Sequence, residues 1–415
     1  MSLPHGPSQT PQDQTFHWFS RPYAYLDECA ARFGETFTLN FQDLGPHVFT
    51  SNPTFIRNIF QGEPEQFLGG EGKEMLRPFL GDHSLLLTDG APYQAHRKGL
   101  LPLFHSPWFD QWSQGLHGVV ERWHVTAPRE ALVHEFCLAV SLEIISSAIF
   151  GREADSAEVS QVVLAFMSGV NFNAQAAVAA GGDNKAMEQL HRNVAELDGL
   201  IARERKRLKA KPDETSLLFE MEKMAEAAGW SEKEVRDEVA TLLIAGHETT
   251  ATSLAWILFE LAKSPATLAK AMGNTDDRFW DGVIKEGMRL WPVIPVVARK
   301  LASPFTWEKW EFAAGTHLVP CIYLAHRRAD RFPQPTVFDP TRFETAPSPF
   351  EYFPFGGGVR RCLGMGMAMV EMKAVLAQLF QKAEITFSGV EKVRPSRRSV
   401  AIIPSGPFRL YNKIR

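Results

Sequence analysis

The chain has 415 residues, of which 45% are hydrophobic and 22% are charged, a composition typical of a folded globular protein and not of a disordered one. Lys and Arg number 44 against 48 Asp and Glu, so the net charge is −4 and no basic field is available to attract nucleic acid or an anionic membrane. Aromatic residues make up 11%, including 30 Phe and 10 Trp, which suits a large apolar cavity as well as a core. We therefore expect no nucleic-acid partner.

The cysteines and the apolar runs indicate the compartment. Four widely spaced cysteines form neither a CxxC pair nor the framework of a secreted protein, so a reducing cytoplasm is the simplest location. The polar, proline-containing N-terminus lacks the apolar stretch of a signal peptide. Charged residues and histidines interrupt the most apolar runs, 131–150 and 239–262, so neither predicts a membrane span. We expect a cytoplasmic protein without a membrane anchor.

The first half of the chain predicts helices and one hairpin. Residues 1–15 are expected to form a flexible leader, and 21–33 have helical spacing that ends at a glycine. Alternating apolar residues on both sides of a Gly-Pro turn predict a β-hairpin over 35–53. From about residue 93 to 150 the pattern is mostly helical.

The second half contains the clearest helix. Ser231 and Glu234 match a capping box, helical periodicity continues to Lys263, and Ser-Pro follows. Such a helix would be roughly 45–50 Å long, enough to cross a whole domain. A second helix is predicted over 277–290, strands and turns over 293–345, and a last helix over 363–382. Residues 16–415 are expected to fold as one unit that is mainly α with small β-sheets.

A glycine-rich loop over 353–364 carries the first chemical signal. Its three glycines allow a tight turn and a close approach to a flat ligand. Cys362 follows where a helix is expected to begin, and the helix dipole there favours a thiolate, which is a strong axial donor to haem iron. Arg360 has the fork geometry that pairs with a carboxylate such as a haem propionate. The alternative is a buried structural cysteine after a turn.

The spacing of the residues in this loop distinguishes a haem ligand from a structural cysteine. The pattern F-G-x-G-x-R-x-C-x-G is matched at each fixed position, namely Phe355, Gly356, Gly358, Arg360, Cys362 and Gly364. With these residues the sequence resembles the cytochrome P-450 haem-thiolate monooxygenases of the soluble bacterial type, over residues 20–410. The resemblance implies the triangular-prism P-450 fold. It also implies haem b, held between the long oxygen-binding helix and the helix after the cysteine loop, with Cys362 on the iron and Phe355 and Gly364 beside the cofactor.

A second motif, Ala-Gly-His-Glu-Thr-Thr, lies in the middle of the long helix. Ala245 and Thr249 are four residues apart and share a face, while Gly246 leaves space beside them. Taken alone, Thr249 could simply bond back to its own helix and Glu248 could lie on a solvated face. The resemblance implies instead that Glu248 and Thr249 are the acid–alcohol pair that delivers protons to dioxygen, and that Ala245 and Gly246 adjoin the haem.

A third pair, Glu286 and Arg289, is spaced as neighbours on one helix face. In most proteins such a pair lies on the surface and contributes little. The resemblance implies a network with Arg342 that supports the haem loop and has no catalytic part.

By position in the family pattern, Arg97 and Arg299 are candidates to bind the haem propionates. Tyr93 stands four residues before Arg97, where the family has Trp or His; this is a departure, although its hydroxyl can still donate a hydrogen bond. His96 is interpreted as an ordinary polar residue.

The resemblance also implies the substrate pocket, for which the sequence offers apolar residues. An apolar substrate follows, with terpenoid, steroid-like or fatty acyl compounds favoured. The candidate pocket residues are Leu242, Val293, Ile294, Val296, Val297 and Ile402.

No fused reductase is expected, so electrons would come from a separate ferredoxin with its reductase or from a flavodoxin. These carriers are acidic, and Lys98, Arg361 and Lys373 are candidates for a basic docking patch. A monomer is expected.

Two other functions stay open. A haem-thiolate peroxygenase or isomerase would need no electron partner, but such relatives typically lack the acid–alcohol pair that Glu248 and Thr249 would form. A non-catalytic haem sensor is the other alternative, and no signalling or DNA-binding module accompanies the pattern.

Overall fold

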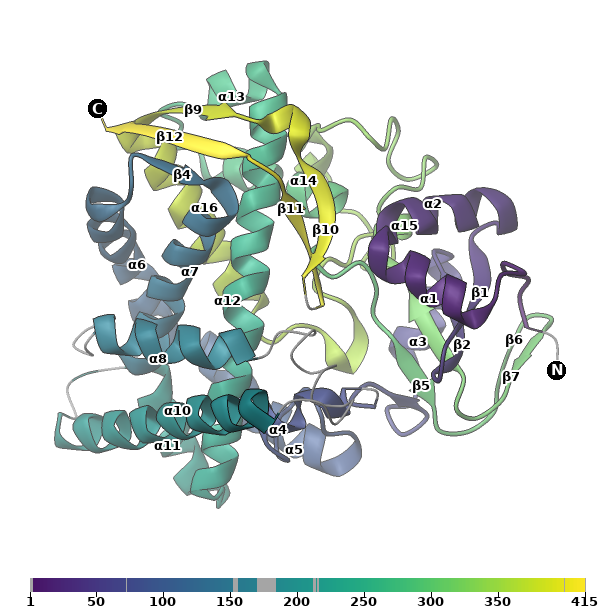
Figure 1. The fold of residues 1–415 in the computed structure, drawn as a ribbon, viewed down its shortest axis with the longest axis horizontal. Helices are drawn as coiled ribbons and strands as arrows, with labels where there is room; N and C mark the ends of the chain where they lie inside the picture. The colour runs from purple at the N-terminus through teal and green to yellow at the C-terminus, as the bar shows by residue number, and fades with distance from the viewer. Residues whose placement is uncertain are drawn as a thin grey trace.

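The computed structural model describes residues 3–414 except 72, 152–155, 170–183, 212–213, 215 and 399. Helices dominate, and the strands form small sheets, which confirms the predicted class. Figure 1 shows α12 upright in the middle of the molecule, with most helices on one side and the largest sheet, flanked by the N-terminal helices, on the other.

The helices span most of the chain. They are α1 (Pro11–Ser20), α2 (Pro22–Phe33), α3 (Pro53–Gln61), α4 (Arg77–Leu80), α5 (Gly90–Leu100), α6 (Pro107–Thr126), α7 (Val133–Phe150), α8 (Ser156–Gly169), α10 (Asn184–Ala210), α11 (Leu217–Ala228), α12 (Glu232–Lys263), α13 (Pro265–Ala271), α14 (Asp277–Leu290), α15 (Ile322–Ala325) and α16 (Met365–Lys382).

The strands are short. They are β1 (Thr36–Phe41), β2 (Gly45–Thr50), β3 (Phe67–Leu68), β4 (Glu130–Leu132), β5 (Arg299–Leu301), β6 (Phe305–Trp307), β7 (Trp310–Phe312), β8 (His317–Pro320), β9 (Ala383–Ser388), β10 (Arg394–Arg398), β11 (Ala401–Ser405) and β12 (Arg409–Ile414). Five of them form a sheet of order β1-β2-β8-β5-β3, three form a sheet of order β4-β12-β9, and β6–β7 and β10–β11 are separate hairpins. The predicted β1–β2 hairpin is confirmed, with Thr36 opposite Thr50.

The long helix α12 organises the helical part. The Ser231 hydroxyl accepts a hydrogen bond from the Glu234 amide at 3.2 Å, while the Glu234 carboxylate accepts one from the Ser231 amide at 2.7 Å. This capping box satisfies two amides that the first turn leaves free. The helix ends at Lys263, as predicted, and α7, α14, α16 and β11 pack around it.

Helix α7 is long and apolar enough to cross a membrane, the one such helix in the described part of the chain. However, 67% of its apolar window is buried inside the protein, where it packs along α12. The apolar composition of α7 is therefore that of a core helix.

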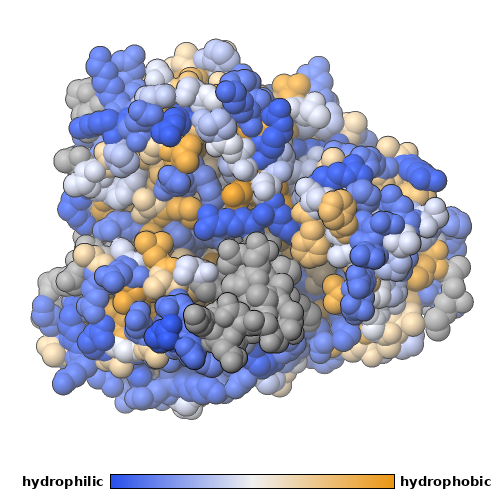
Figure 2. Space-filling view, viewed as in Figure 1, coloured by the Kyte–Doolittle hydropathy of each residue, from blue (hydrophilic) through white to orange (hydrophobic). Residues whose placement is uncertain are grey.

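The surface of the molecule mixes the two kinds of side chain. On the face drawn in Figure 2, apolar groups are interspersed with hydrophilic ones.

The N-terminal segment differs from the expected flexible leader. Helix α1 begins at Pro11, so the expected boundary at residue 15 falls inside a helix. Pro4 and His5 accept hydrogen bonds from the side chain and the amide of Thr38, at 2.7 and 3.3 Å, and Gln14 accepts one from the Asn40 amide. Because β1 is an edge strand with free amides, the segment before it finds partners there that the sequence pattern does not reveal.

A buried ion pair joins α14 to the segment before the cysteine loop. The guanidinium of Arg289 donates two hydrogen bonds to Glu286, at 2.7 and 2.8 Å, and both side chains are fully buried. Arg342 donates to the same carboxylate at 3.2 Å, so the three residues of the expected network are in contact. Arg289 also donates to the carbonyl of His326, whose ring accepts from the amide of Phe353. The pair is thereby linked to the start of the loop.

The substitution Glu286→Gln should lower the free energy of unfolding by about 3–5 kcal/mol, because it leaves the buried Arg289 cation without its counter-charge. Urea-induced unfolding measures this loss. Glu344→Gln, at an exposed position on the same connecting segment, is the control and should stay within about 0.5 kcal/mol of the parent. Equal midpoints for both variants would contradict the role given to the pair.

Candidate active site

The glycine-rich loop is pressed against α3. A β-carbon at Gly358 would lie 2.3 Å from the carbonyl oxygen of Phe60, and one at Gly357 would lie 2.2 Å from the Phe60 ring. Gly358 also has φ +66°, a conformation that other residues rarely adopt. The Cys362 amide donates to the Phe355 carbonyl at 2.9 Å and closes the loop. Glycine is therefore required here both for space and for backbone conformation.

Cys362 is the exposed one of the four cysteines, whereas Cys29, Cys137 and Cys321 are buried. This exposure excludes the alternative of a buried structural cysteine. Protein atoms around the thiol nevertheless raise its pKa by burial. A hydrogen bond from the Gly364 backbone and the charges of Arg97 and Arg361 lower that pKa. Gly364 caps α16, which begins at Met365. The thiol is thus accessible to a ligand at the start of a helix, as predicted.

Three of the predicted cofactor residues lie together on the neighbouring elements. The Arg360 guanidinium lies 3.5 Å from the centre of the Tyr93 ring, and the Tyr93 hydroxyl accepts from Arg97 at 3.3 Å and donates to the Val359 carbonyl at 2.7 Å. Arg360 forms an ion pair with Asp89 and donates to the Leu85 carbonyl.

One cation of this group, Lys73, was not among the residues predicted from the sequence. Lys73 donates to the carbonyls of Gly69 and Leu86, and burial followed by the charges of Arg360 and Arg299 lowers its pKa to about 8. Burial and Arg360 lower the pKa of Arg299 to about 10 in the same way. No motif marks Lys73 in the sequence, because only the fold brings it to this place.

Three of these cations, Lys73, Arg299 and Arg360, interact with one carboxylate, that of Asp89. Arg97 adds a fourth positive charge that acts on Arg360. Asp89 itself also accepts hydrogen bonds from the amides of Gly69 and Gly70, at 2.8 Å each. Mutually repelling cations in a partly buried place are stabilised by added anions. The cluster therefore fits a ligand with two carboxylates, such as the propionates of a haem.

The motif on α12 is only partly oriented as expected. Ala245 is exposed although Leu243 and His247 on either side are buried, so this face of the helix borders open space. Thr249 donates a hydrogen bond to the Ala245 carbonyl at 2.6 Å. This is the bond back to its own helix that was the alternative to a role in proton delivery. Gly246 faces α7 instead of the cofactor side: a β-carbon there would lie 3.1 Å from Ile145. Its small size permits close packing of the two helices.

Glu248 is partly buried, with 25% of its side chain exposed. Burial raises its pKa, and the charge of Arg398 opposes this rise. The carboxylate oxygen lies 3.2 Å from Nε of Arg398, a residue that the sequence analysis did not select.

The candidate pocket residues divide into two groups. Leu242, Ile294, Val296 and Val297 are half-buried, and Val297 lies within 3.6 Å of a β-carbon built at Gly356 in the cysteine loop.

Val293 and Ile402 are core residues. Ile402 is fully buried in a cluster with Tyr23 and Leu26, and its amide donates to the Val293 carbonyl. The backbone of Ile402 thus lies beside Val293, but its side chain packs in the N-terminal core and not in a pocket. Phe355 is half-buried and contacts the core around α12 and α16.

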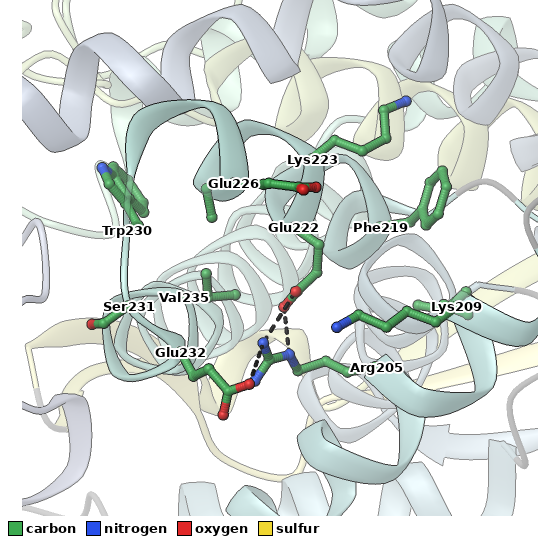
Figure 3. A pocket seen from close by; sticks show the side chains of 12 residues that line it. Arg205, Lys209, Phe219, Glu222, Lys223, Glu226, Trp230, Ser231, Glu232 and Val235 are labelled. Carbon is green, nitrogen blue, oxygen red and sulfur yellow. Dashed lines mark hydrogen bonds and ion pairs between the residues drawn. The ribbon is translucent and has the colours of Figure 1, made fainter.

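A surface pocket of about 340 Å³ lies elsewhere, between α10, α11 and the start of α12 (Figure 3). Arg205 crosses it and donates to Glu222 at 3.1 Å and to Glu232 at 3.2 Å. Arg205 pairs with Glu222 and Glu232 inside this pocket, and none of the lining residues belongs to the predicted site. It is not the active site.

If the cation cluster binds the haem carboxylates, haem binding should depend on pH. Since the pKa of Lys73 is about 8, its ammonium is lost above that pH, and we expect the affinity for haem to fall as pH rises above about 8. Lys73→Met should weaken binding about tenfold or more, the cost of one charged hydrogen bond, and should abolish this fall. Transfer of haem to apomyoglobin between pH 7 and 9.5 measures both. Lys270→Met, at an exposed site on α13, is the control; an unchanged pH profile in Lys73→Met would contradict the assignment.

Comparisons with known proteins agree with this geometry. The family model described as Cytochrome P450 matches residues 4–411. Cytochrome P450 135B1 of Mycobacterium tuberculosis (strain H37Rv) is 32% identical over 99% of this chain and 91% of its own length, and cytochrome P450 135A1 of the same strain is 31% identical over 97% and 93%. A retinoic acid-bound cyanobacterial CYP120A1 shares the fold, with a TM-score of 0.82 over 100% of both chains at 21% identity. With its cysteine loop, its cation cluster and this match over nearly its whole length, the chain belongs to the cytochrome P450 family of haem monooxygenases.

Proposed function

We propose that this P450 inserts one oxygen atom of dioxygen into a C–H or C=C bond of an apolar small molecule, with terpenoid, steroid-like or fatty acyl compounds favoured. The observation that carries the proposal is the combination of an exposed Cys362 thiol with a partly buried Glu248 beside Thr249. A thiolate ligand favours O–O cleavage, and a nearby acid supplies the protons that cleavage consumes.

The described residues fit haem b. When bound, the haem would supply the redox chemistry that activates dioxygen. Cys362 would ligate its iron, and Arg97, Arg299, Arg360 and Lys73 would bind its carboxylates. The glycines at 356–358 would allow a flat ring to lie close to the loop backbone.

Glu248 and Thr249 handle protons in this proposal. Because burial raises the pKa of Glu248, its carboxyl takes up a proton at a higher pH than an exposed glutamate does. An acid whose pKa lies nearer the working pH transfers protons more effectively. Thr249 lies next along the helix, and its hydroxyl already has an acceptor in the Ala245 carbonyl, which leaves its oxygen free to accept.

The substrate class follows from the pocket residues that remain accessible. Four of them are apolar and half-buried, namely Leu242, Ile294, Val296 and Val297. An apolar ligand that covers them would gain free energy from the burial of apolar surface. The structural neighbour binds retinoic acid, which is also largely apolar. This likeness supports the chemical class and no particular compound.

Electrons would come from a separate ferredoxin with its reductase, or from a flavodoxin. A pocket of about 570 Å³ lies against the outer side of the cysteine loop, lined by Phe350, Met365 and Met369 and by the cations Lys285 and Arg361. Apolar contact with flanking positive charge suits an acidic carrier.

Of the three basic residues expected in the docking patch, Arg361 and Lys98 are exposed. Lys373 pairs with Asp281 at 2.8 Å and with Asp277 at 3.6 Å, so it adds little free charge.

We further propose a cytoplasmic monomer in which the described residues form one haem domain that includes the N-terminal segment packed on β1. The balanced composition and the buried position of α7 support this arrangement. A haem-thiolate peroxygenase or isomerase and a haem sensor are the alternatives, and Glu248 beside Thr249 favours the monooxygenase over both.

The reaction type can be tested with purified protein. Turnover of an apolar substrate should require NAD(P)H, ferredoxin and its reductase, and hydrogen peroxide alone should support much less. The reduced carbon monoxide complex should show a red-shifted Soret band that Cys362→Ser abolishes, since the shift depends on the thiolate. Equal turnover with peroxide would indicate a peroxygenase, and reversible ligand binding without turnover would indicate a sensor.

The docking surface can be tested by charge reversal. Arg361→Glu should lower the second-order rate constant of reduction by ferredoxin roughly tenfold or more at low salt, because opposite charges steer the encounter. Stopped-flow reduction measures this, and the difference should shrink at high salt. Lys270→Glu on α13 is the matched reversal; equal rates for the two variants would argue against docking at the loop.

A further inference from the structure

The β10–β11 hairpin is fixed against α12. The Trp256 indole donates to the Ile402 carbonyl at 2.7 Å, and the Ile402 amide donates to the Val293 carbonyl at 2.9 Å. Figure 1 shows β10 and β11 running beside α12. Glu248 lies eight residues before Trp256, about 12 Å along the axis. The long side chain of Arg398, at the end of the hairpin, reaches it.

Arg398 is the last residue of β10 and pairs with Ala401. Its Nε lies 3.2 Å from a carboxylate oxygen of Glu248, and 55% of its side chain is exposed against 25% for Glu248. That oxygen is buried and accepts no hydrogen bond from the described residues, so the contact is an ion pair without hydrogen-bond alignment. The guanidinium can therefore turn outward to water at small cost, whereas the carboxylate has less room to follow.

No second cation competes for Glu248 among the described neighbours. His134 on α7 bonds to Thr252 at 3.1 Å, and burial followed by the charge of Arg398 lowers its pKa to about 4. His247, next to Glu248 on α12, bonds to the Leu138 carbonyl at 2.8 Å, and its pKa is also lowered, first by burial. Both rings are neutral near pH 7, so Arg398 is the charge that faces the acid.

We propose that Arg398 is a positioning residue for Glu248: its guanidinium holds the carboxylate at the seam between the hairpin and α12, and its outward swing lets Glu248 carry protons inward. The inference rests on the proposed acid role of Glu248. For each of the two protons that O–O cleavage consumes, Glu248 takes one proton from solvent, passes it toward Thr249 and returns to the carboxylate that Arg398 holds. Arg398 keeps its proton throughout, because a guanidinium group is not deprotonated in proteins.

The hold can be measured without turnover, by infrared titration of the Glu248 carboxyl band in the resting holoenzyme. The band is assigned by its absence in Glu248→Gln. Arg398→Gln should raise the titration midpoint by ~0.5 pH unit or more, the size of a partly exposed ion pair, and Arg398→Lys should stay near the parent. Arg394→Gln, at an exposed position of the same strand, should leave the midpoint unchanged. A midpoint unmoved in Arg398→Gln would overturn the proposal.

A double-mutant comparison tests whether Arg398 acts through Glu248. The readouts are the solvent deuterium isotope effect on turnover and the fraction of NAD(P)H that ends in product. Arg398→Gln should change both in the parent background and neither in the Glu248→Gln background. A change of equal size in both backgrounds would overturn the proposal.

Different results would overturn the acid role of Glu248 and the positioning role of Arg398. If Glu248→Gln leaves the isotope effect and the coupling as in the parent, the proposed acid role fails, whatever the infrared titration shows. If Glu248→Gln alters them and Arg398→Gln does not, the acid role stands and the role of Arg398 is overturned.

Discussion

The buried pair of Glu286 and Arg289 is the contact on which the site depends. Two charges taken out of water are stable only when both are fully paired and hydrogen-bonded, and here the carboxylate and the guanidinium satisfy each other together with Arg342 and nearby backbone groups. Because Arg289 also binds the carbonyl of His326, and the His326 ring accepts from the Phe353 amide, the pair fixes where the cysteine loop begins. The position of Cys362 is thus set by a network that contains no cofactor ligand.

A second constraint is electrical. Lys73, Arg97, Arg299 and Arg360 come from four different parts of the chain, and the fold holds them together against their mutual repulsion. The cluster is thus prepared for a doubly anionic ligand. The haem propionates proposed to bind here would relieve the repulsion between these cations, and that relief would add to the binding energy.

Much of this arrangement could be predicted from sequence because it depends on local chemistry. The capping box at Ser231 fixes the start of α12, and Ser-Pro fixes its end. The spacing of the glycines predicts the tight loop before Cys362, which the structure contains. What failed depends on direction and distance in space. Helix periodicity places Gly246 near the site but does not tell which neighbouring helix it faces. The sequence pattern around an apolar residue such as Ile402 is the same whether the side chain lies in the core or in a pocket. Lys73, His326 and Arg398 carry no motif, and each gains its place through partners far away in the chain.

The largest sheet has a consequence for the synthesis of the protein. Strand β2 pairs in parallel with β8, and His47 lies beside His317, about 270 residues later in the chain. At roughly 5–20 residues per second, the free edge of β2 would wait about 15–50 s on the ribosome for its partner. During synthesis the β1–β2 hairpin therefore exposes an unpaired strand edge to which other chains can bind. The cellular yield of folded protein should depend on chaperones and on the rate of translation as well as on the stability of the native state.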